Sequence, residues 1–315
     1  MTPAPPSGLE LVHVGADVEL LGAFSELMLE ITPEWSRSVE QMLATFALDP
    51  TQRRVIARLD GEAVGFGTVG RIWVFPVDDP SAWCELGVRA AVRGRGVGSA
   101  LLAWSQATAP QLGKSRLQVP CSGDRPEGVR FLTARGFVEY DRMARVELPL
   151  AGVVAPEVVL PAGVRLSSLA AEPALRESAY AAAVEIFADL PDPEPVLAGS
   201  FEEWRLRDVD TPDGPLDGYL LAVAGDDVVG FCRLLNEQRG RVVGHALTGT
   251  RRAWRGRGIA KALKRAAIVW AIERGAERMS AENAVGNEAM RGINRSLGFT
   301  PGPDFIELRG AIPAR

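Results

Sequence analysis

The apolar residues of this chain follow two different periods, and each change of period marks a new element. Residues 18–29 and 38–46 carry apolar side chains at helical spacing, whereas residues 9–14, 54–59 and 63–69 are short apolar stretches typical of strands. Asp60-Gly61 lies between two of these stretches and is typical of a tight hairpin turn. The first part of the chain therefore predicts a strand, two helices and a hairpin, and residues 72–75 are expected to continue the second hairpin strand.

The same series of elements is then completed and begins again. The remaining elements of the first series are strand 83–88, a helix after residue 96, strand 116–119, helix 127–134 and strand 137–148. Residues 151–163 contain Pro156 and Pro161 and no helical period, so they predict a linker. The second series is strand 164–167, helices 172–187 and 201–207, hairpin 219–224 with 228–235, strand 242–250, a helix after residue 258, strand 278–282, helix 288–296 and strand 305–308.

Three landmarks in these series occur twice at nearly one spacing. Arg93 and Arg255 are 162 residues apart, and Gly136-Phe137 is also 162 residues from Gly298-Phe299. Val64-Gly65-Phe66 lies 165 residues before Val229-Gly230-Phe231. Repeats in one order at one offset indicate a duplicated domain. We therefore expect an α/β protein with one domain over residues 1–150, a linker over 151–163 and a second domain over 164–315.

The most informative repeated stretch is a loop that precedes a helix in each half. It reads Arg-Gly-Arg-Gly-Val-Gly at 93–98 and Arg-Gly-Arg-Gly-Ile-Ala at 255–260, so both copies fit R-x-x-G-x-(G/A). The first amides of a helix lack partners and carry the positive end of its dipole, and glycine lets a phosphate approach them. Neither copy has the Lys-Ser/Thr pair of a Walker loop, and neither follows the first strand of its half as a dinucleotide fingerprint does. The loops predict pyrophosphate sites.

The composition limits the class of protein. The chain has 315 residues, of which 47% are hydrophobic and 24% charged, as expected for a soluble protein of about two domains. No apolar run reaches the roughly 20 residues of a membrane span, and no secretory signal is visible, so a cytoplasmic protein is expected. Three scattered cysteines predict free thiols, and two histidines without clustered ligands predict no metal site. The net charge of −5 disfavours nucleic acid and favours a cationic small substrate.

Each half resembles the GNAT superfamily of N-acetyltransferases in its R-x-x-G-x-(G/A) loop, the helix behind it, and the closing Arg135-Gly136-Phe137 or Leu297-Gly298-Phe299. The resemblance covers nearly the whole chain as two tandem units. It implies in each half a mixed, mostly antiparallel twisted sheet flanked by helices, with central strands splayed to admit the pantetheine of acetyl-CoA. The cofactor-binding residues that it implies are Val88, Arg93, Gly94, Arg95, Gly96, Val97 and Gly98 in the first half, and Leu247, Thr248, Thr250, Arg255, Gly256, Arg257, Gly258, Ile259, Ala260 and Asn287 in the second.

The two halves match the family unequally. Asn287 stands where many members carry an asparagine that lines the CoA arm, and Asn294 stands where many carry a tyrosine proposed to protonate the leaving thiolate. The first half has Arg125 and Leu132 at these places. An asparagine can donate a hydrogen bond to sulfur but cannot release a proton, and leucine can do neither. The second half is therefore expected to be the catalyst, and the first to bind CoA or to shape the acceptor cleft.

Few residues of the second half can accept a proton from an amine, which must be neutral to attack a thioester. His245 lies on the strand that leads into the second loop, and Glu282 ends the next strand. A polar strand residue and a solvated strand end are the alternative interpretations. Glu85 is the corresponding candidate in the first half, with a solvent-facing sheet residue as its alternative.

These observations predict an acetyl-CoA-dependent N-acetyltransferase that acts on a primary amine of a small, cationic molecule, with His245, Glu282 and Asn294 as its catalytic residues. We expect no membrane or nucleic-acid partner and a monomer or a homodimer. A CoA-binding regulatory or scaffolding protein without turnover is the alternative, because neither half keeps the tyrosine.

Overall fold

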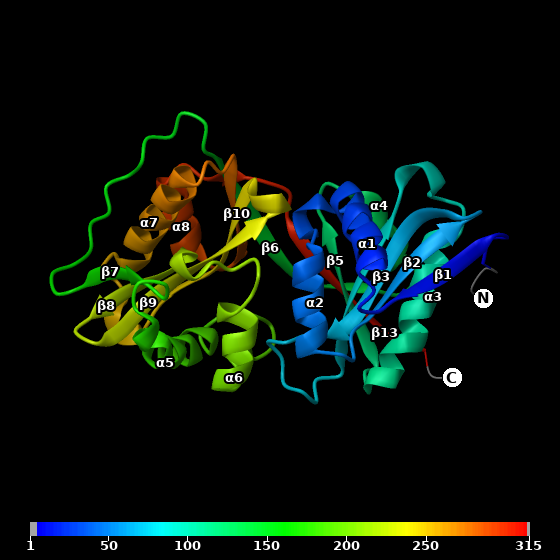
Figure 1. The fold of residues 1–315 in the computed structure, drawn as a ribbon, viewed down its shortest axis with the longest axis horizontal. Coiled ribbons are helices and arrows are strands. Elements are labelled where there is room, and N and C mark those ends of the chain that lie inside the picture. The colour runs from blue at the N-terminus through cyan, green and yellow to red at the C-terminus, as the bar shows by residue number, and fades with distance from the viewer. Residues whose placement is uncertain (1–4, 314–315) are drawn as a thin grey trace. The chain divides into compact units, whose positions relative to one another are not determined.

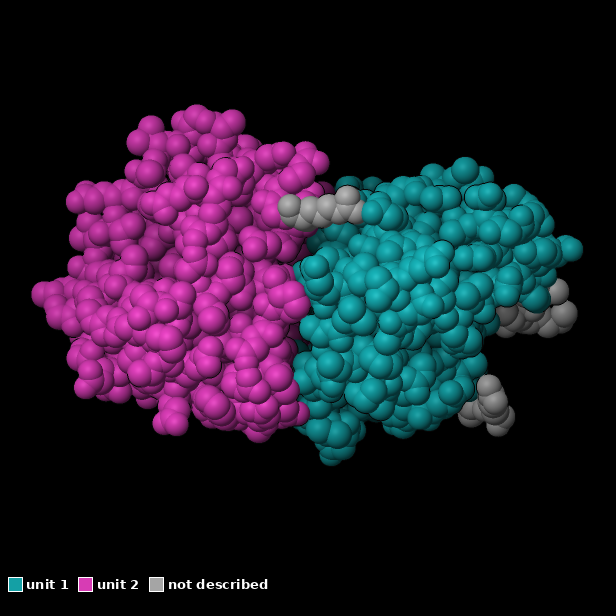
Figure 2. Space-filling view, in the orientation of Figure 1, with its two compact units in different colours: residues 1–142, 305–315 teal, residues 143–304 magenta. Residues whose placement is uncertain are grey.

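The computed structural model describes residues 5–313, apart from the side chain of Arg239. The chain forms two compact units (Figure 2): one contains the chain up to Arg142 together with the stretch from Phe305 onward, and the other is Met143–Asp304. The expected division at residues 150 and 164 follows the sequence repeats, whereas the compact units differ from it at the last strand of each repeat. Strand β6 (Val138–Pro149) pairs from Met143 onward within the second unit, and strand β13 (Phe305–Ala311) pairs within the first.

The first unit is a sheet with helices on both faces. Its sheet has the order β1-β2-β3-β4-β5-β13, and only β4 and β5 run parallel. Helices α1 and α2 pack on one face around Phe24 and Ile56, and α3 and α4 pack on the other around Leu102 and Leu132 (Figure 1). Its elements besides β13 are β1 (Leu9–Val14), α1 (Val18–Ile31), α2 (Val39–Leu48), β2 (Arg53–Leu59), β3 (Glu62–Arg71), β4 (Ser81–Val88), α3 (Val97–Thr108), β5 (Arg116–Ser122) and α4 (Pro126–Thr133).

The second unit repeats this plan. Its sheet has the order β6-β11-β10-β9-β8-β7, with the short β12 paired to β6 and only β10 and β11 parallel. Helices α7 and α8 lie on one face of the sheet and α5 and α6 on the other (Figure 1). Its elements are β7 (Arg165–Ser168), α5 (Arg176–Phe187), α6 (Phe201–Trp204), β8 (Tyr219–Ala224), β9 (Asp227–Glu237), β10 (Val242–Thr250), α7 (Ile259–Glu273), β11 (Arg278–Ala284), α8 (Glu288–Ser296) and β12 (Thr300–Pro301).

The structure confirms the predicted α/β class, with a mixed, mostly antiparallel sheet flanked by helices in each unit. The expected extension of the hairpin over residues 72–75 is wrong, because β3 ends at Arg71 and the chain turns there. The predicted linker contains neither helix nor strand, and its Val153, Val158 and Leu160 pack against the core beneath α7.

Candidate active site

In both units the two parallel strands separate part-way along their length. Strands β4 and β5 are paired from Ser81 to Trp83, although β4 continues to Val88. Strands β10 and β11 are paired from Val242 to His245, and β10 continues to Thr250. Beyond these points the facing backbone groups are not used by the neighbouring parallel strand, so they can bond a ligand that lies between the strands. The splayed strands that the family resemblance implied are therefore present in each unit.

The strand that leads into the second loop contains a bulge. In the pairing of β10 with β9, the register shifts between His245 and Leu247, so that Ala246 is the extra residue. The corresponding pairing of β4 with β3 runs from Val88 to Ala82 without a shift. A bulge turns backbone groups away from the ladder, and an amide donor beside the splay suits a developing oxyanion. The two units therefore differ in the backbone groups that they present beside the splay.

The two Arg/Gly loops have nearly the same backbone. Gly256 and Gly258 have φ of 76° and 83°, and their counterparts Gly94 and Gly96 have 78° and 91°. Gly258 and Gly96 are the N-caps of α7 and α3, and neither helix start has a side-chain cap. A Cβ added at Gly258 would meet no atom within 4 Å, whereas one at Gly96 would lie 3.4 Å from Pro6 Cδ. The first amides of α7 are thus approachable by a phosphate, and those of α3 are more covered.

The first arginine of each loop fastens the loop to the strand before it. Arg255 Nε donates to the Thr250 carbonyl at 3.1 Å, and Arg93 Nε donates to the Val88 carbonyl at 3.2 Å. Arg255 also pairs with Asp189. The positive charge of Arg255, which was expected to face a phosphate, is therefore compensated by Asp189. The helix amides and the exposed Arg257 are the groups of the second loop that could hold an anion.

Two of the buried polar side chains on the α7 and α8 face of the second unit, His245 and Asn294, have atoms without hydrogen-bond partners among residues 5–313. His245 Nδ1 donates to the Ser280 carbonyl at 3.3 Å, which leaves Nε2 as an acceptor, and this atom is inaccessible to solvent and unbonded among residues 5–313. Burial, followed by the charge of Lys264, holds the pKa of His245 well below 6.5, so the ring is neutral. Asn294 is 0% exposed, and neither atom of its amide is bonded within the same residues. Buried polar atoms without partners are costly, so a ligand that bonds them would bind favourably here.

Two further expected cofactor-binding residues of the second unit, Asn287 and Thr248, have local side-chain contacts. Asn287 caps α8, because its Oδ1 accepts a hydrogen bond from the Met290 amide at 3.2 Å. Thr248 Oγ1 donates to Cys232 Sγ at 3.2 Å. These contacts order the α8 start and the splayed part of β10.

Lys264 is a buried cation on α7 beneath this site. It is 2% exposed, its Nζ lies 5.3 Å from the centroid of the Phe299 ring, and no carboxylate pairs with it among the described residues. Burial lowers the pKa of Lys264 from 10.5 to about 8. The ammonium group therefore destabilises the second unit at neutral pH.

Lys264→Met is expected to increase the free energy of unfolding by about 1–3 kcal/mol near pH 7, because it replaces a buried charge with an apolar chain of similar length. The folded chain loses the lysine proton near pH 8 and the unfolded chain only near 10.5, so the stability of the wild type rises between these values. The gain should therefore shrink toward pH 10. Urea denaturation at the two pH values measures it, and a less stable variant at pH 7 would contradict the argument.

A carboxylate cluster lies on the α5 and α6 face of the same sheet, beside the point where β10 and β11 separate. Ser280 Oγ donates to Glu237 Oε2 at 3.2 Å, and Arg145 Nη1 donates to Glu282 Oε1 at 3.4 Å. Burial raises the pKa of Glu237 to about 7; Arg145 opposes this shift and Glu282 adds to it. A Cβ at Gly244 would lie 2.0 Å from Glu237 Oε1, so this glycine makes room for the carboxyl group. A carboxyl that titrates near neutral pH is suited to general base catalysis.

Sequence analysis missed Glu237. In the sequence Glu237 is an acidic residue at a strand end, and the sequence alone does not distinguish a buried glutamate there from a solvated one. Its raised pKa arises because β10, β11 and β6 enclose it, and β11 and β6 are distant from it in the chain. Glu282, which was expected, lies in this cluster, whereas His245 and Asn294 belong to the opposite face.

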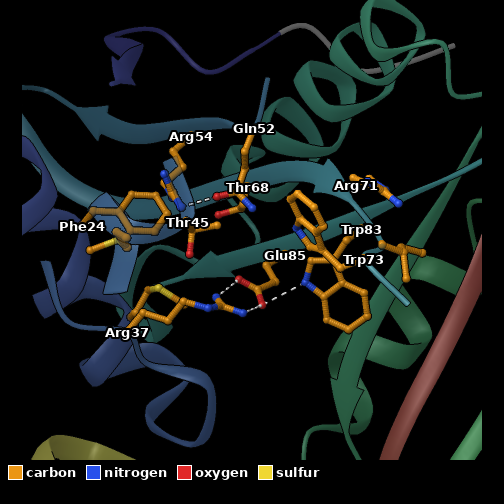
Figure 3. A pocket seen from close by; sticks show the side chains of 13 residues that line it. Phe24, Arg37, Thr45, Gln52, Arg54, Thr68, Arg71, Trp73, Trp83 and Glu85 are labelled. Carbon is orange, nitrogen blue, oxygen red and sulfur yellow. Dashed lines mark hydrogen bonds and ion pairs between the residues drawn. The ribbon is translucent and has the colours of Figure 1, made fainter. Parts of the chain in front are cut away.

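Glu85 of the first unit is held in a different way. It is 4% exposed and accepts two hydrogen bonds from Arg37 at 2.7 and 2.9 Å and one from Trp83 Nε1 at 3.0 Å (Figure 3). These partners outweigh burial and lower the pKa of Glu85. A carboxylate so fully bonded is a poor proton acceptor near neutral pH.

The described residues contain neither a group of three His, Cys, Asp or Glu side chains placed to hold a metal nor a helix long and apolar enough to cross a membrane. Cys84, Cys121 and Cys232 are buried free thiols, as predicted.

The acetyltransferase (GNAT) family matches the chain over residues 21–137 and 175–299. The chain therefore belongs to this family and is an N-acetyltransferase. It is 28% identical over 303 residues to the mycothiol acetyltransferase of Thermobispora bispora, an alignment that covers 93% of this chain and 95% of that protein.

Two solved structures have the same tandem fold. The tandem GNAT protein from the clavulanic acid biosynthesis pathway matches with a TM-score of 0.75 and 18% identity, over 98% of this chain and 99% of that one. The GCN5-related N-acetyltransferase of Sphaerobacter thermophilus matches with a TM-score of 0.72 and 20% identity, over 99% and 98% of the two chains. The likeness extends over both units.

Proposed function

We propose that the chain transfers the acetyl group of acetyl-CoA to a primary amine of a small molecule, and that the second unit is the catalyst. The observation that carries this proposal is the coincidence, in one unit, of the open Gly258 loop, the bulged splayed strand and the Glu237 carboxyl group. The first unit has a loop of the same shape, but its β4 is unbulged and its Glu85 is fully bonded. The mycothiol acetyltransferase relative supports a small-molecule acceptor.

The residues of the second unit fit acetyl-CoA. The amides at Gly258, Ile259 and Ala260 would hold the pyrophosphate, since the N-cap glycine leaves them approachable. The separated parts of β10 and β11 would admit the pantetheine, and the unpartnered polar atoms of His245 and Asn294 would bond its polar groups. Acetyl-CoA supplies an activated acetyl group when bound.

Glu237 is the proposed proton acceptor. It lies on the sheet face opposite α7, together with Glu282, and both carboxylates favour an incoming ammonium group. Glu237 takes the proton of that group directly or through one water. It can do so when it is ionised, which requires a pH above its pKa of about 7. Asn294 can donate a hydrogen bond to the departing sulfur, but it cannot protonate it.

His245→Ala is expected to raise the KM for acetyl-CoA several-fold. The acidic limb of the pH–rate profile should stay unchanged, near pH 7. The reason is that His245 is neutral throughout this range and faces the helices on the CoA side. Steady-state kinetics at several pH values tests this role. If the limb disappears in this variant, His245 rather than Glu237 is the base.

Release of free thiol from acetyl-CoA, measured with a panel of small amines, tests the proposed function. Amine-dependent thiol release is expected, with cationic small amines among the preferred acceptors. Acetyl-CoA binding without thiol release for any amine would instead favour a CoA-binding regulatory or scaffolding protein.

A further inference from the structure

The first unit contains a pocket that the proposed function does not use. It has a volume of about 290 Å³ and is lined from α1, α2, β2, β3 and β4 (Figure 3). This is close to the lower end of the range of about 300–1,000 Å³ for small-molecule sites. Its walls are largely apolar and aromatic, and they include Phe24, Met28, Met42, Trp73 and Trp83.

The charges in this pocket do not balance. The pocket is lined by Arg37, Arg54 and Arg71 but by only one carboxylate, Glu85. Arg37 donates two hydrogen bonds, of 2.7 and 2.9 Å, to the Glu85 carboxylate. Arg71 lies over the Trp73 ring, 4.7 Å from its centroid. The side chains that line the pocket therefore include three guanidinium groups and one carboxylate, and Asp49 adds a second negative charge near Arg54.

Arg54 is buried and incompletely hydrogen-bonded. It is 3% exposed on β2, its Nη2 donates to Gln52 Oε1, and its Nη1 is inaccessible to solvent without a hydrogen-bond partner among residues 5–313. Burial and Arg37 lower the pKa of Arg54 to about 10, so it is still charged at neutral pH. A buried guanidinium with an unused donor is costly, and an anion in the pocket would supply both the charge and the acceptor.

We propose that this pocket binds a small organic carboxylate through Arg54, with the apolar part of the ligand against the aromatic walls. A carboxylate suits the planar guanidinium, and an apolar body suits the tryptophan and phenylalanine side chains. The fully bonded Glu85 leaves the site without a base, so the pocket binds its ligand and does not acetylate it. The first unit thereby has a ligand of its own, whichever residues of the second unit carry out acetyl transfer.

Calorimetric titration of the full chain with three probes of one shape tests the proposal: 3-phenylpropionate, 3-phenylpropanol and 3-phenylpropylamine. The carboxylate is expected to bind at least tenfold more tightly than the alcohol, and the amine most weakly. Inorganic phosphate, which lacks the apolar body, should bind more weakly than the carboxylate. These comparisons use the wild-type chain and do not depend on the folding of a variant.

Two variants on β2 locate the site. Arg54→Met should weaken 3-phenylpropionate binding at least tenfold, whereas Arg53→Met removes an exposed neighbouring guanidinium and should leave it unchanged. Equal binding of carboxylate and alcohol would overturn the proposal, as would phosphate binding as tightly as the carboxylate. Undiminished binding to a folded Arg54→Met chain would also overturn it. None of these outcomes depends on acetyl transfer.

Discussion

Gly258→Val is expected to weaken acetyl-CoA binding at least tenfold, which corresponds to about 1.4 kcal/mol. Gly258 has φ of 83°, a conformation that valine rarely adopts, and it caps the start of α7. The new side chain would also stand in the open space through which a phosphate must reach the helix amides. Calorimetric titration of acetyl-CoA measures the loss.

Gly275→Val is the matched control for this substitution. Gly275 follows the other end of α7, has φ of 68°, and its added Cβ would likewise meet no atom within 4 Å. The two variants therefore share the backbone strain but differ in their distance from the loop. If both lose affinity equally, strain in the helix explains the effect. If neither does, the pyrophosphate is not held at Gly258.

Glu237→Gln is expected to lower kcat/KM by about 100-fold, the lower end of the range for loss of a general base. The wild-type rate should rise with pH through about 7, because Glu237 must be ionised to accept a proton. Glutamine keeps the size of the side chain and cannot titrate, so this acidic limb should vanish from the residual rate. A limb lying well below pH 6.5 would point to His245 instead.

The stability of the same variant separates catalysis from folding. The pKa of Glu237 is raised from 4.5 to about 7, so the folded chain binds the proton more tightly than the unfolded chain and loses stability as the pH rises between these values. Above pH 7 the neutral glutamine should therefore be at least as stable as the wild type. Glu147→Gln, which removes a carboxylate 3.3 Å from the same Arg145, is the control and should retain the rate and the limb. A rate loss equal to that of Glu237→Gln would show that the charge of the cluster, and not a base, matters.

The elements were predictable because their patterns are local. The helix at Glu288–Ser296 and the strand at Val242–Thr250 have the bounds that periodicity predicted. Residues 72–75 are apolar and so look like a strand in the sequence, but they form a turn. Phe75 is buried from this turn without pairing with a neighbouring strand. The membership of β6 and β13 could not be predicted, because the sequence repeat is the same whichever unit the last strand joins.

The backbone features of the candidate site could be predicted from the sequence. The ion-pair partners and the pKa values of its charged groups could not. The loop glycines could be identified from the sequence because a helix start with positive φ needs them. The partners of the loop arginines could not, because Asp189 lies 66 residues from Arg255. Nor could the environments that raise the pKa of Glu237 and lower that of Glu85, since both depend on strands and helices packed from distant segments.

The most direct test of the central claim, that the second unit carries out acetyl transfer, is the rate of thiol release by Gly96→Val and Gly258→Val at limiting acetyl-CoA. These glycines are the equivalent N-caps of α3 and α7. We predict that Gly258→Val loses most of its amine-dependent thiol release and that a folded Gly96→Val chain keeps most of its own. The reverse pattern, with activity kept by Gly258→Val and lost by Gly96→Val, would contradict the account and place catalysis in the first unit.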